Sequence, residues 1–145
     1  MNINTKLNYY WSGSKMVIYN QYTWGNSSHG YSYVHFKTDI GLYTYVMTRV
    51  EAVGINYAIG APIRCVWGWY TYSYLIDRGS ESAYSGLSAN GVYMSSDGYV
   101  VFRGYASNMG DSSLMLNMVH ANPAGYGATV NITAVNLNNT SGNYY

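Results

Sequence analysis

The chain has 145 residues, of which 48% are hydrophobic, 17% aromatic and only 9% charged, and its net charge is +1. A single domain of this length can bury a full core, and its aromatic content argues against intrinsic disorder. The seven basic residues are spread along the chain, so they form no cluster to neutralise a nucleic-acid backbone, and no apolar run is long enough for a membrane-spanning helix.

The first thirty residues combine a high density of Asn, Ser and Gly with two short apolar patches, at residues 9–11 and 16–19. This composition predicts a loose lead-in that becomes ordered only against a partner. It lacks a basic stretch followed by an apolar core, so we expect no secretory signal here.

Residues 31–38 alternate between apolar and polar side chains, which predicts a strand that ends in a turn at residues 39–41. Residues 43–76 alternate over two longer halves, rich in β-branched and aromatic side chains and separated by Gly54, Gly60 and Pro62. A period of two with these residue types is typical of strands, and glycine and proline interrupt them. We therefore expect a long antiparallel pair, which the other segments cover.

Residues 77–91 are polar and rich in Gly and Ser, which predicts a surface loop. Asn90-Gly91 and Asp97-Gly98 are dipeptides that favour hairpin turns, and they bracket the apolar residues 92–94. A hairpin is therefore expected here, with its second strand over residues 99–105.

Further strands are expected over residues 114–120 and 128–135, whereas residues 137–145 form a polar tail that we expect to fray. No stretch has the spacing of an amphipathic helix. Short strands with a turn signal about every ten residues are typical of sandwiches. The sequence thus predicts an all-β protein, with a single-domain antiparallel β-sandwich of jelly-roll-like kind.

The single cysteine, Cys65, excludes an internal disulfide framework. Because it alternates with Ile63 and Trp67, we interpret it as a small buried apolar residue and not as a nucleophile.

Glu51 lies in the middle of an expected strand, two residues from Arg49 on the same face, which predicts a structural ion pair rather than an acid catalyst. The four aspartates occupy turn-like runs, where Asp bonds to the local backbone: Asp39, Asp77, Asp97 and Asp111.

The histidines are far apart in the sequence, at His29, His35 and His120, and none has a second ligand at metal spacing. A site shared in space, for example around the axis of an oligomer, remains open. The chain also contains no nucleophile elbow, P-loop or dinucleotide-binding fingerprint. We therefore expect no catalysis, no metal and no cofactor.

Aromatic residues are the strongest functional signal. Between Trp67 and Tyr74 they alternate along one expected strand, so one face supplies the core and the other presents aromatic rings to solvent. Sugars offer an apolar C–H face and hydroxyl groups, which such a face fits, but protein interfaces favour the same residues. The candidate ligand-binding residues are Trp67, Trp69, Tyr70 and Tyr72, with Tyr93 and Asp97 from the hairpin.

Several segments, in order, resemble a known family: YSYVHFKTDI, RVEAVGINY, PIRCVWGWYTY, DGYVVFR and the closing ATVNITAV. Together they span residues 31–135 and are similar to the C-terminal receptor-binding region of tail fibres of marine and cyanobacterial bacteriophages. The resemblance implies a homotrimeric tip on the virion that binds a bacterial surface polysaccharide or an outer-membrane protein. Residues 1–30 would then be an attachment or trimer-forming segment, and residues 31–145 the receptor-binding domain.

Three other functions remain open. In a structural virion or filament protein, the same aromatic residues would be contacts between subunits and no ligand would exist. A soluble lectin-like module of bacterial origin is a further reading, and a polysaccharide-cleaving enzyme is the least supported. The leading hypothesis is a non-enzymatic adhesion module.

Overall fold

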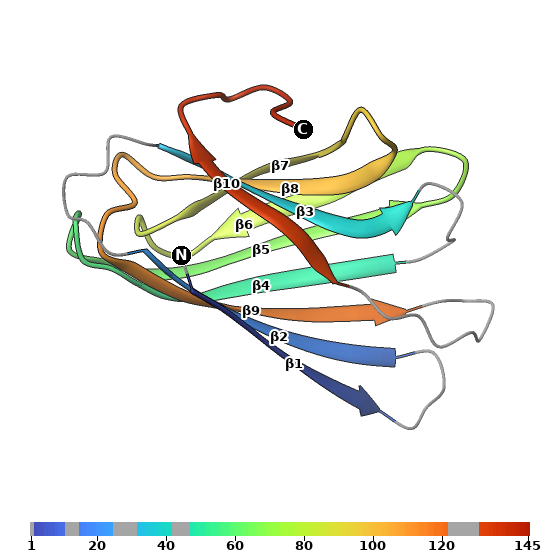
Figure 1. Ribbon diagram of the computed structural model, residues 1–145, viewed down its shortest axis with the longest axis horizontal. Helices are drawn as coiled ribbons and strands as arrows, with labels where there is room; N and C mark the ends of the chain where they lie inside the picture. Colours follow the sequence, from blue (N-terminus) through green and yellow to red (C-terminus); the bar gives the residue numbers. More distant parts are fainter. Residues whose placement is uncertain (1, 11–14, 25–31, 42–46, 122–130) are drawn as a thin grey trace.

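The computed structural model of the chain describes residues 2–10, 15–24, 32–41, 47–121 and 131–145. These residues form ten strands and no helix, and therefore no helix long and apolar enough to cross a membrane. The strands lie in two antiparallel sheets that face each other (Figure 1). This arrangement confirms the prediction of an all-β, antiparallel sandwich.

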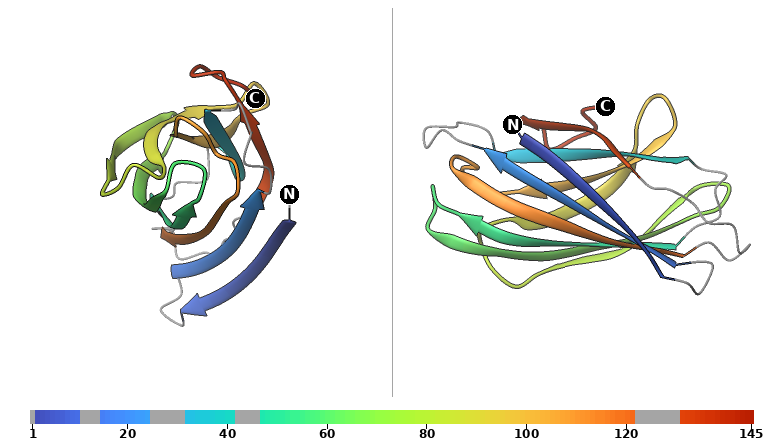
Figure 2. Two further views of the ribbon diagram at one scale, coloured as in Figure 1. Left: turned by 90° about the vertical axis from the view of Figure 1, so that its left-hand side faces the viewer. Right: turned by 60° about the horizontal axis from the view of Figure 1, so that its bottom comes forward.

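The larger sheet has six strands and the smaller sheet has four. In order across the larger sheet lie β1 (Asn2–Tyr10), β2 (Lys15–Trp24), β9 (Ser112–Ala121), β4 (Met47–Asn56), β5 (Ala61–Thr71) and β6 (Leu75–Ser82). The smaller sheet consists of β10 (Ile132–Asn138), β3 (Tyr33–Gly41), β8 (Tyr99–Tyr105) and β7 (Ser88–Met94). Seen end-on in Figure 2, the sheets enclose a common interior, and β1 is the outermost strand on one side.

Aromatic side chains from both sheets fill this interior. The rings of Phe36 on β3 and Phe102 on β8 stack with centroids 4.8 Å apart. From the opposite sheet, the rings of Trp67 and Trp69 on β5 lie 5.0 Å and 5.6 Å from that of Phe102. The Trp67 Nε1–H also donates a 2.8 Å hydrogen bond to the carbonyl oxygen of Arg103, so one buried side chain ties the two sheets together.

The long antiparallel pair predicted within residues 43–76 is confirmed as β4 and β5. Their register places Val50 opposite Trp67 and Ala52 opposite Cys65, and all four of these residues are buried. The chain turns between the two strands at residues 57–60, where Gly60 has a φ of 66° that favours glycine. The part of the prediction that covers residues 43–46 lies outside the described residues.

The prediction of a surface loop over residues 77–91 is wrong for residues 77–82 and 88–91, where β6 and the start of β7 lie, and holds only for residues 83–87 between them. Among the described strands β6 pairs only with β5, at the edge of the larger sheet, and its residues from Asp77 to Ser82 are exposed on both faces. Hydrogen bonds of the backbone hold such a strand, and its side chains need no apolar alternation. The amino-acid composition of β6 therefore resembles that of a loop.

Two of the predicted turns also differ from the structure. Residues 39–41 belong to β3, and Asn90-Gly91 forms a bulge in β7 between Ala89 and Val92, where Gly91 has a φ of 84°. A bulge and a hairpin turn both require a residue that tolerates positive φ, so the dipeptide alone cannot distinguish them. The turn at Asp97-Gly98 is confirmed, with Gly98 N donating to Ser95 O at 3.0 Å.

Both ends of the chain are more structured than predicted. Residues 2–10 and 15–24 form β1 and β2, and β2 pairs along its whole length with β9. They are thus part of the larger sheet and not a loose lead-in. The predicted strand over residues 128–135 begins at Ile132, and residues 128–130 lie outside the described part. The tail predicted to fray extends β10 to Asn138 and then packs on the smaller sheet.

Candidate functional site

The outer face of β4, β5 and β6 carries the candidate site. Along β5 burial alternates, so Trp67 and Trp69 point into the core whereas Tyr70 is half-buried on the outer side. Tyr72 and Tyr74 follow in the turn before β6 and are 48% and 61% exposed. The predicted alternation is observed along β5, with the tryptophans inside and Tyr70 outside. The predicted continuation of this strand through Tyr74 is wrong, because β5 ends at Thr71 and residues 72–74 form a turn.

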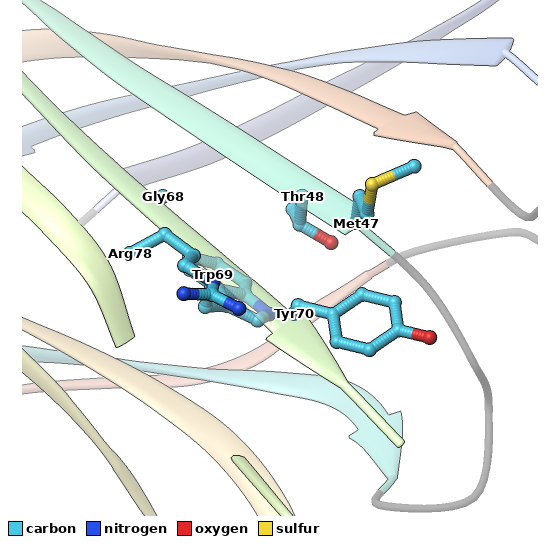
Figure 3. A pocket seen from close by; sticks show the side chains of 6 residues that line it. All are labelled: Met47, Thr48, Gly68, Trp69, Tyr70 and Arg78. Carbon is cyan, nitrogen blue, oxygen red and sulfur yellow. The ribbon is translucent and has the colours of Figure 1, made fainter. Parts of the chain in front are cut away.

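An open pocket of about 540 Å³ lies beside Tyr70, where β4 begins and β5 ends. Exposed Met47 on β4 and exposed Arg78 on β6 flank it, and Figure 3 shows the Tyr70 ring extending outward next to them. The pocket thus combines an aromatic ring, a thioether and a guanidinium group. Its lining residues are Met47, Thr48, Gly68, Trp69, Tyr70 and Arg78.

Gly68 keeps the surface of β5 low in this pocket. It lies opposite Gly79 of β6, so no side chain rises from either strand at this position. Gly79 has a φ of 109°, which favours glycine, but a Cβ on Gly68 would meet nothing closer than Gly79 O at 3.9 Å. The fold therefore does not require glycine at position 68, and a glycine inside a strand is typical of sites that a ligand approaches closely.

A second, charged hollow of about 240 Å³ adjoins the first along the same face. Arg49, which lines it, is the register partner of Gly68. The Arg49 guanidinium lies 3.0 Å from the Glu51 carboxylate, which confirms the predicted ion pair, and Arg64 Nε lies 3.8 Å from the same carboxylate. The hollow is lined by Arg49, Glu51, Arg64, Val66, Glu81 and Ala83.

Trp67 and Trp69, two of the predicted site residues, are almost fully buried, at 0% and 2% exposure. A ligand therefore cannot reach the Trp67 ring without separating the sheets. Trp69 supports the pocket from below, and its Nε1–H is buried with no hydrogen-bond partner among the described residues. Of the four predicted residues around β5, Tyr70 and Tyr72 are the ones with rings on the accessible side.

The other two predicted site residues, Tyr93 and Asp97, belong to the smaller sheet and do not line the pocket. Tyr93 is 8% exposed and lies beneath the C-terminal tail. Asp97, in the β7–β8 turn, forms a 2.6 Å ion pair with Lys37. The hydrogen bonds from Lys37 and then Ser95 hold the pKa of the Asp97 carboxyl below its ordinary value. The structure does not bring the six candidates together.

Four pocket residues were not singled out from the sequence: Met47, Thr48, Gly68 and Arg78. A glycine within an otherwise aromatic strand was a usable signal for Gly68. Arg78 lies in the stretch predicted as a loop, so its place beside β5 became visible only once β6 was known to pair there.

The single cysteine and the possible metal ligands were also located in the structure. Cys65 is 1% exposed, and burial, with a smaller effect of the Glu51 charge, raises the pKa of its thiol to about 12. The thiol is therefore protonated at neutral pH, in agreement with the predicted buried role. No group of three His, Cys, Asp or Glu side chains within the described ranges is placed to hold a metal ion.

Comparison of the chain with protein-family models, with curated proteins and with solved structures gives no match in any of the three.

Proposed function

We propose that the chain is a non-enzymatic adhesion module that binds a bacterial cell-surface glycan in the open pocket beside Tyr70. The observation that carries the proposal concerns the floor of the pocket at Gly68. The glycine leaves this floor free of a side chain, although the fold has room for one there. A sugar ring placed over this floor would contact the Tyr70 ring with its C–H face. Arg78 would then donate hydrogen bonds to its hydroxyl groups.

The adjoining charged hollow extends the proposed site along β5. Arg49 and Arg64 are 53% and 64% exposed and share one carboxylate, Glu51, so each guanidinium keeps donors for a ligand. A site that continues past one pocket suits a chain of sugar units better than a single sugar. The proposed ligand is therefore a surface polysaccharide, with Tyr72 and Tyr74 available to contact its further units.

The resemblance to phage tail fibres supplies the biological setting of the proposal: a homotrimeric fibre tip on the virion. The chain mass is 16.2 kDa, so light scattering after gel filtration distinguishes a trimer from a monomer. A stable monomer would remove the fibre-tip setting and leave a lectin-like module with the same pocket.

Gly68→Val tests the site directly. The added side chain has room within the fold and a β-branched residue suits a strand, but it fills the floor of the pocket. We expect host polysaccharide to bind the variant at least about tenfold more weakly, equivalent to about 1.4 kcal/mol. Ser113→Val is the matched control, because Ser113 lies in β9 of the same sheet and does not line the pocket.

Unchanged polysaccharide binding by a folded Gly68→Val variant would refute the pocket as the site. Adsorption to cells that depends on an outer-membrane protein, and not on polysaccharide, would replace the glycan with a protein receptor.

An assembly role is the second candidate, and a specific surface favours it. At the other end of β4 the outer face carries Ile55 at 55% exposure, and Met115 on β9 is 38% exposed. Tyr57, in the following turn, is 72% exposed. Exposed apolar residues of this kind are typical of subunit contacts. If Ile55→Lys or Tyr70→Ala releases monomers from an oligomer, those residues are packing contacts.

A further inference from the structure

The C-terminal segment, residues 139–145, crosses the outer face of the smaller sheet as a strap (Figure 1). Arg103 of β8 donates a 2.9 Å hydrogen bond to the Gly142 carbonyl, and Ser96 N donates to the Tyr145 carbonyl at 3.3 Å. The Lys37 ammonium lies 5.5 Å from the centre of the Tyr145 ring. The strap therefore contacts three strands or their turns through both backbone and side chains.

His35 of β3 lies at the centre of these contacts and is fully buried. Its Nε2 is 2.9 Å from the Thr140 carbonyl oxygen, which only accepts hydrogen bonds, so Nε2 carries the hydrogen. Nδ1 is then unprotonated and accepts from the Tyr93 hydroxyl at 2.8 Å. The same hydroxyl oxygen accepts from the backbone N–H groups of Tyr144 at 3.1 Å and Tyr145 at 3.4 Å.

We propose that this strap is an acid-released latch: protonation of His35 frees residues 139–145 and uncovers the outer face of the smaller sheet. The latch is separate from the glycan pocket and does not depend on it.

The reason lies in the number of donors at one oxygen. In neutral His35 the Tyr93 hydroxyl donates one hydrogen bond and accepts two, which satisfies its lone pairs. When Nδ1 gains a proton, it becomes a third donor aimed at the same oxygen, and the hydroxyl hydrogen loses its acceptor. At least one donor must then give way, and the amides of Tyr144 and Tyr145 belong to a segment outside both sheets, whereas His35 and Tyr93 lie on paired strands.

Charges around His35 act in the same direction. The groups that face it are Tyr93 of β7, Arg103 of β8, Asn138 of β10 and Tyr144 of the strap, with Lys37 two residues along its own strand. None of them is a carboxylate. Burial lowers the pKa of His35 and the Arg103 charge lowers it further, whereas the hydrogen bonds to Thr140 and Asn138 oppose this effect in part.

The direction in which pH changes the stability of strap docking follows from this pKa shift. With the strap docked, the pKa of His35 lies below its ordinary value of about 6.5, and release returns it toward that value. Docking is therefore most stable above about pH 6.5 and weakens as the pH falls toward the lowered pKa.

A spin label at Ser141→Cys measures the latch, since Ser141 is exposed and the natural Cys65 is buried and will not react. We expect an immobile label at pH 7.5 and a mobile one at pH 5, while the circular dichroism of the sandwich stays constant. Tyr93→Phe, which removes the shared oxygen, is expected to mobilise the label at both pH values. His35→Gln, which retains an N–H donor but does not titrate, should abolish the transition.

Four results would overturn the latch. The label could have the same mobility at both pH values, or the strap could stay immobile in Tyr93→Phe. The transition could persist in a folded His35→Gln variant, or the whole domain could unfold together with strap release. Asp97 titrates below this range because Lys37 holds its pKa down, so the Lys37 pair does not contribute to the transition.

Discussion

The two outer faces of the sandwich are built from similar alternating strands, but the chain treats them differently. On the smaller sheet His35 is fully buried, and residues 139–145 lie over it. On the larger sheet Met47 of β4 and Arg64 of β5 are exposed, and two hollows remain open between them. A face that the chain covers itself contributes to stability, whereas a face left open with aromatic and charged side chains is available to a partner.

This difference has an energetic consequence. Polar groups beneath the strap are buried and hydrogen-bonded, so removing one leaves others without partners. Polar groups on the open face are solvated, so removing them costs little stability but changes what the face can bind. Stability measurements and binding measurements should therefore separate the two faces.

The largest expected effect is in the core that both faces share. Trp67→Ala should lower the free energy of unfolding by about 3–5 kcal/mol, because it creates a large cavity and removes the hydrogen bond to Arg103. Tyr74→Ala, in the turn that follows β5, should change it by less than about 0.5 kcal/mol. Denaturant unfolding measures both, and equal effects would contradict the orientation of this aromatic series.

The covered face is tested by Tyr93→Phe. Loss of the hydroxyl leaves the amides of Tyr144 and Tyr145 without their acceptor, and we expect a cost of about 1–3 kcal/mol in thermal or denaturant unfolding. Tyr99→Phe is the control, since Tyr99 is 39% exposed on the same sheet and should be neutral. A neutral Tyr93→Phe would mean that the strap adds no stability.

On the open face, Glu51→Gln should cost about 1 kcal/mol or less, although it removes the partner of both Arg49 and Arg64. The cost should shrink further as salt is added, because exposed charges are screened. A loss well above this value, insensitive to salt, would indicate that these charges are structural and not available to a ligand.

The smallest effect concerns Asp97 at the β7–β8 turn. Because its pKa is lowered in the folded state, its contribution to stability is present at neutral pH and is lost as the pH falls through the lowered value. The melting temperature of the Asp97→Asn variant should therefore fall less as the pH is lowered than that of the unchanged chain. Identical acid profiles would show that the pair with Lys37 contributes nothing.

The sequence by itself determined the elements whose side chains alternate. Strands β4 and β5 each bury one face against the core, and the period of two that this requires is visible in the residues themselves. The same pattern predicted that Trp67 and Trp69 share a face opposite Tyr70, that Cys65 is buried, and that Glu51 pairs with Arg49. Local geometry suffices for each of these.

Tertiary structure alone decided the rest. Edge strand β6 is held by backbone hydrogen bonds to β5, so its side chains carry no strand pattern, and the sequence does not show that Arg78 lies beside the pocket. Contacts between distant segments, such as β2 with β9 and the strap with His35, depend on how the whole chain closes. Which outer face stays open was likewise undetermined, because an alternating strand specifies that one face is outside and not what covers it.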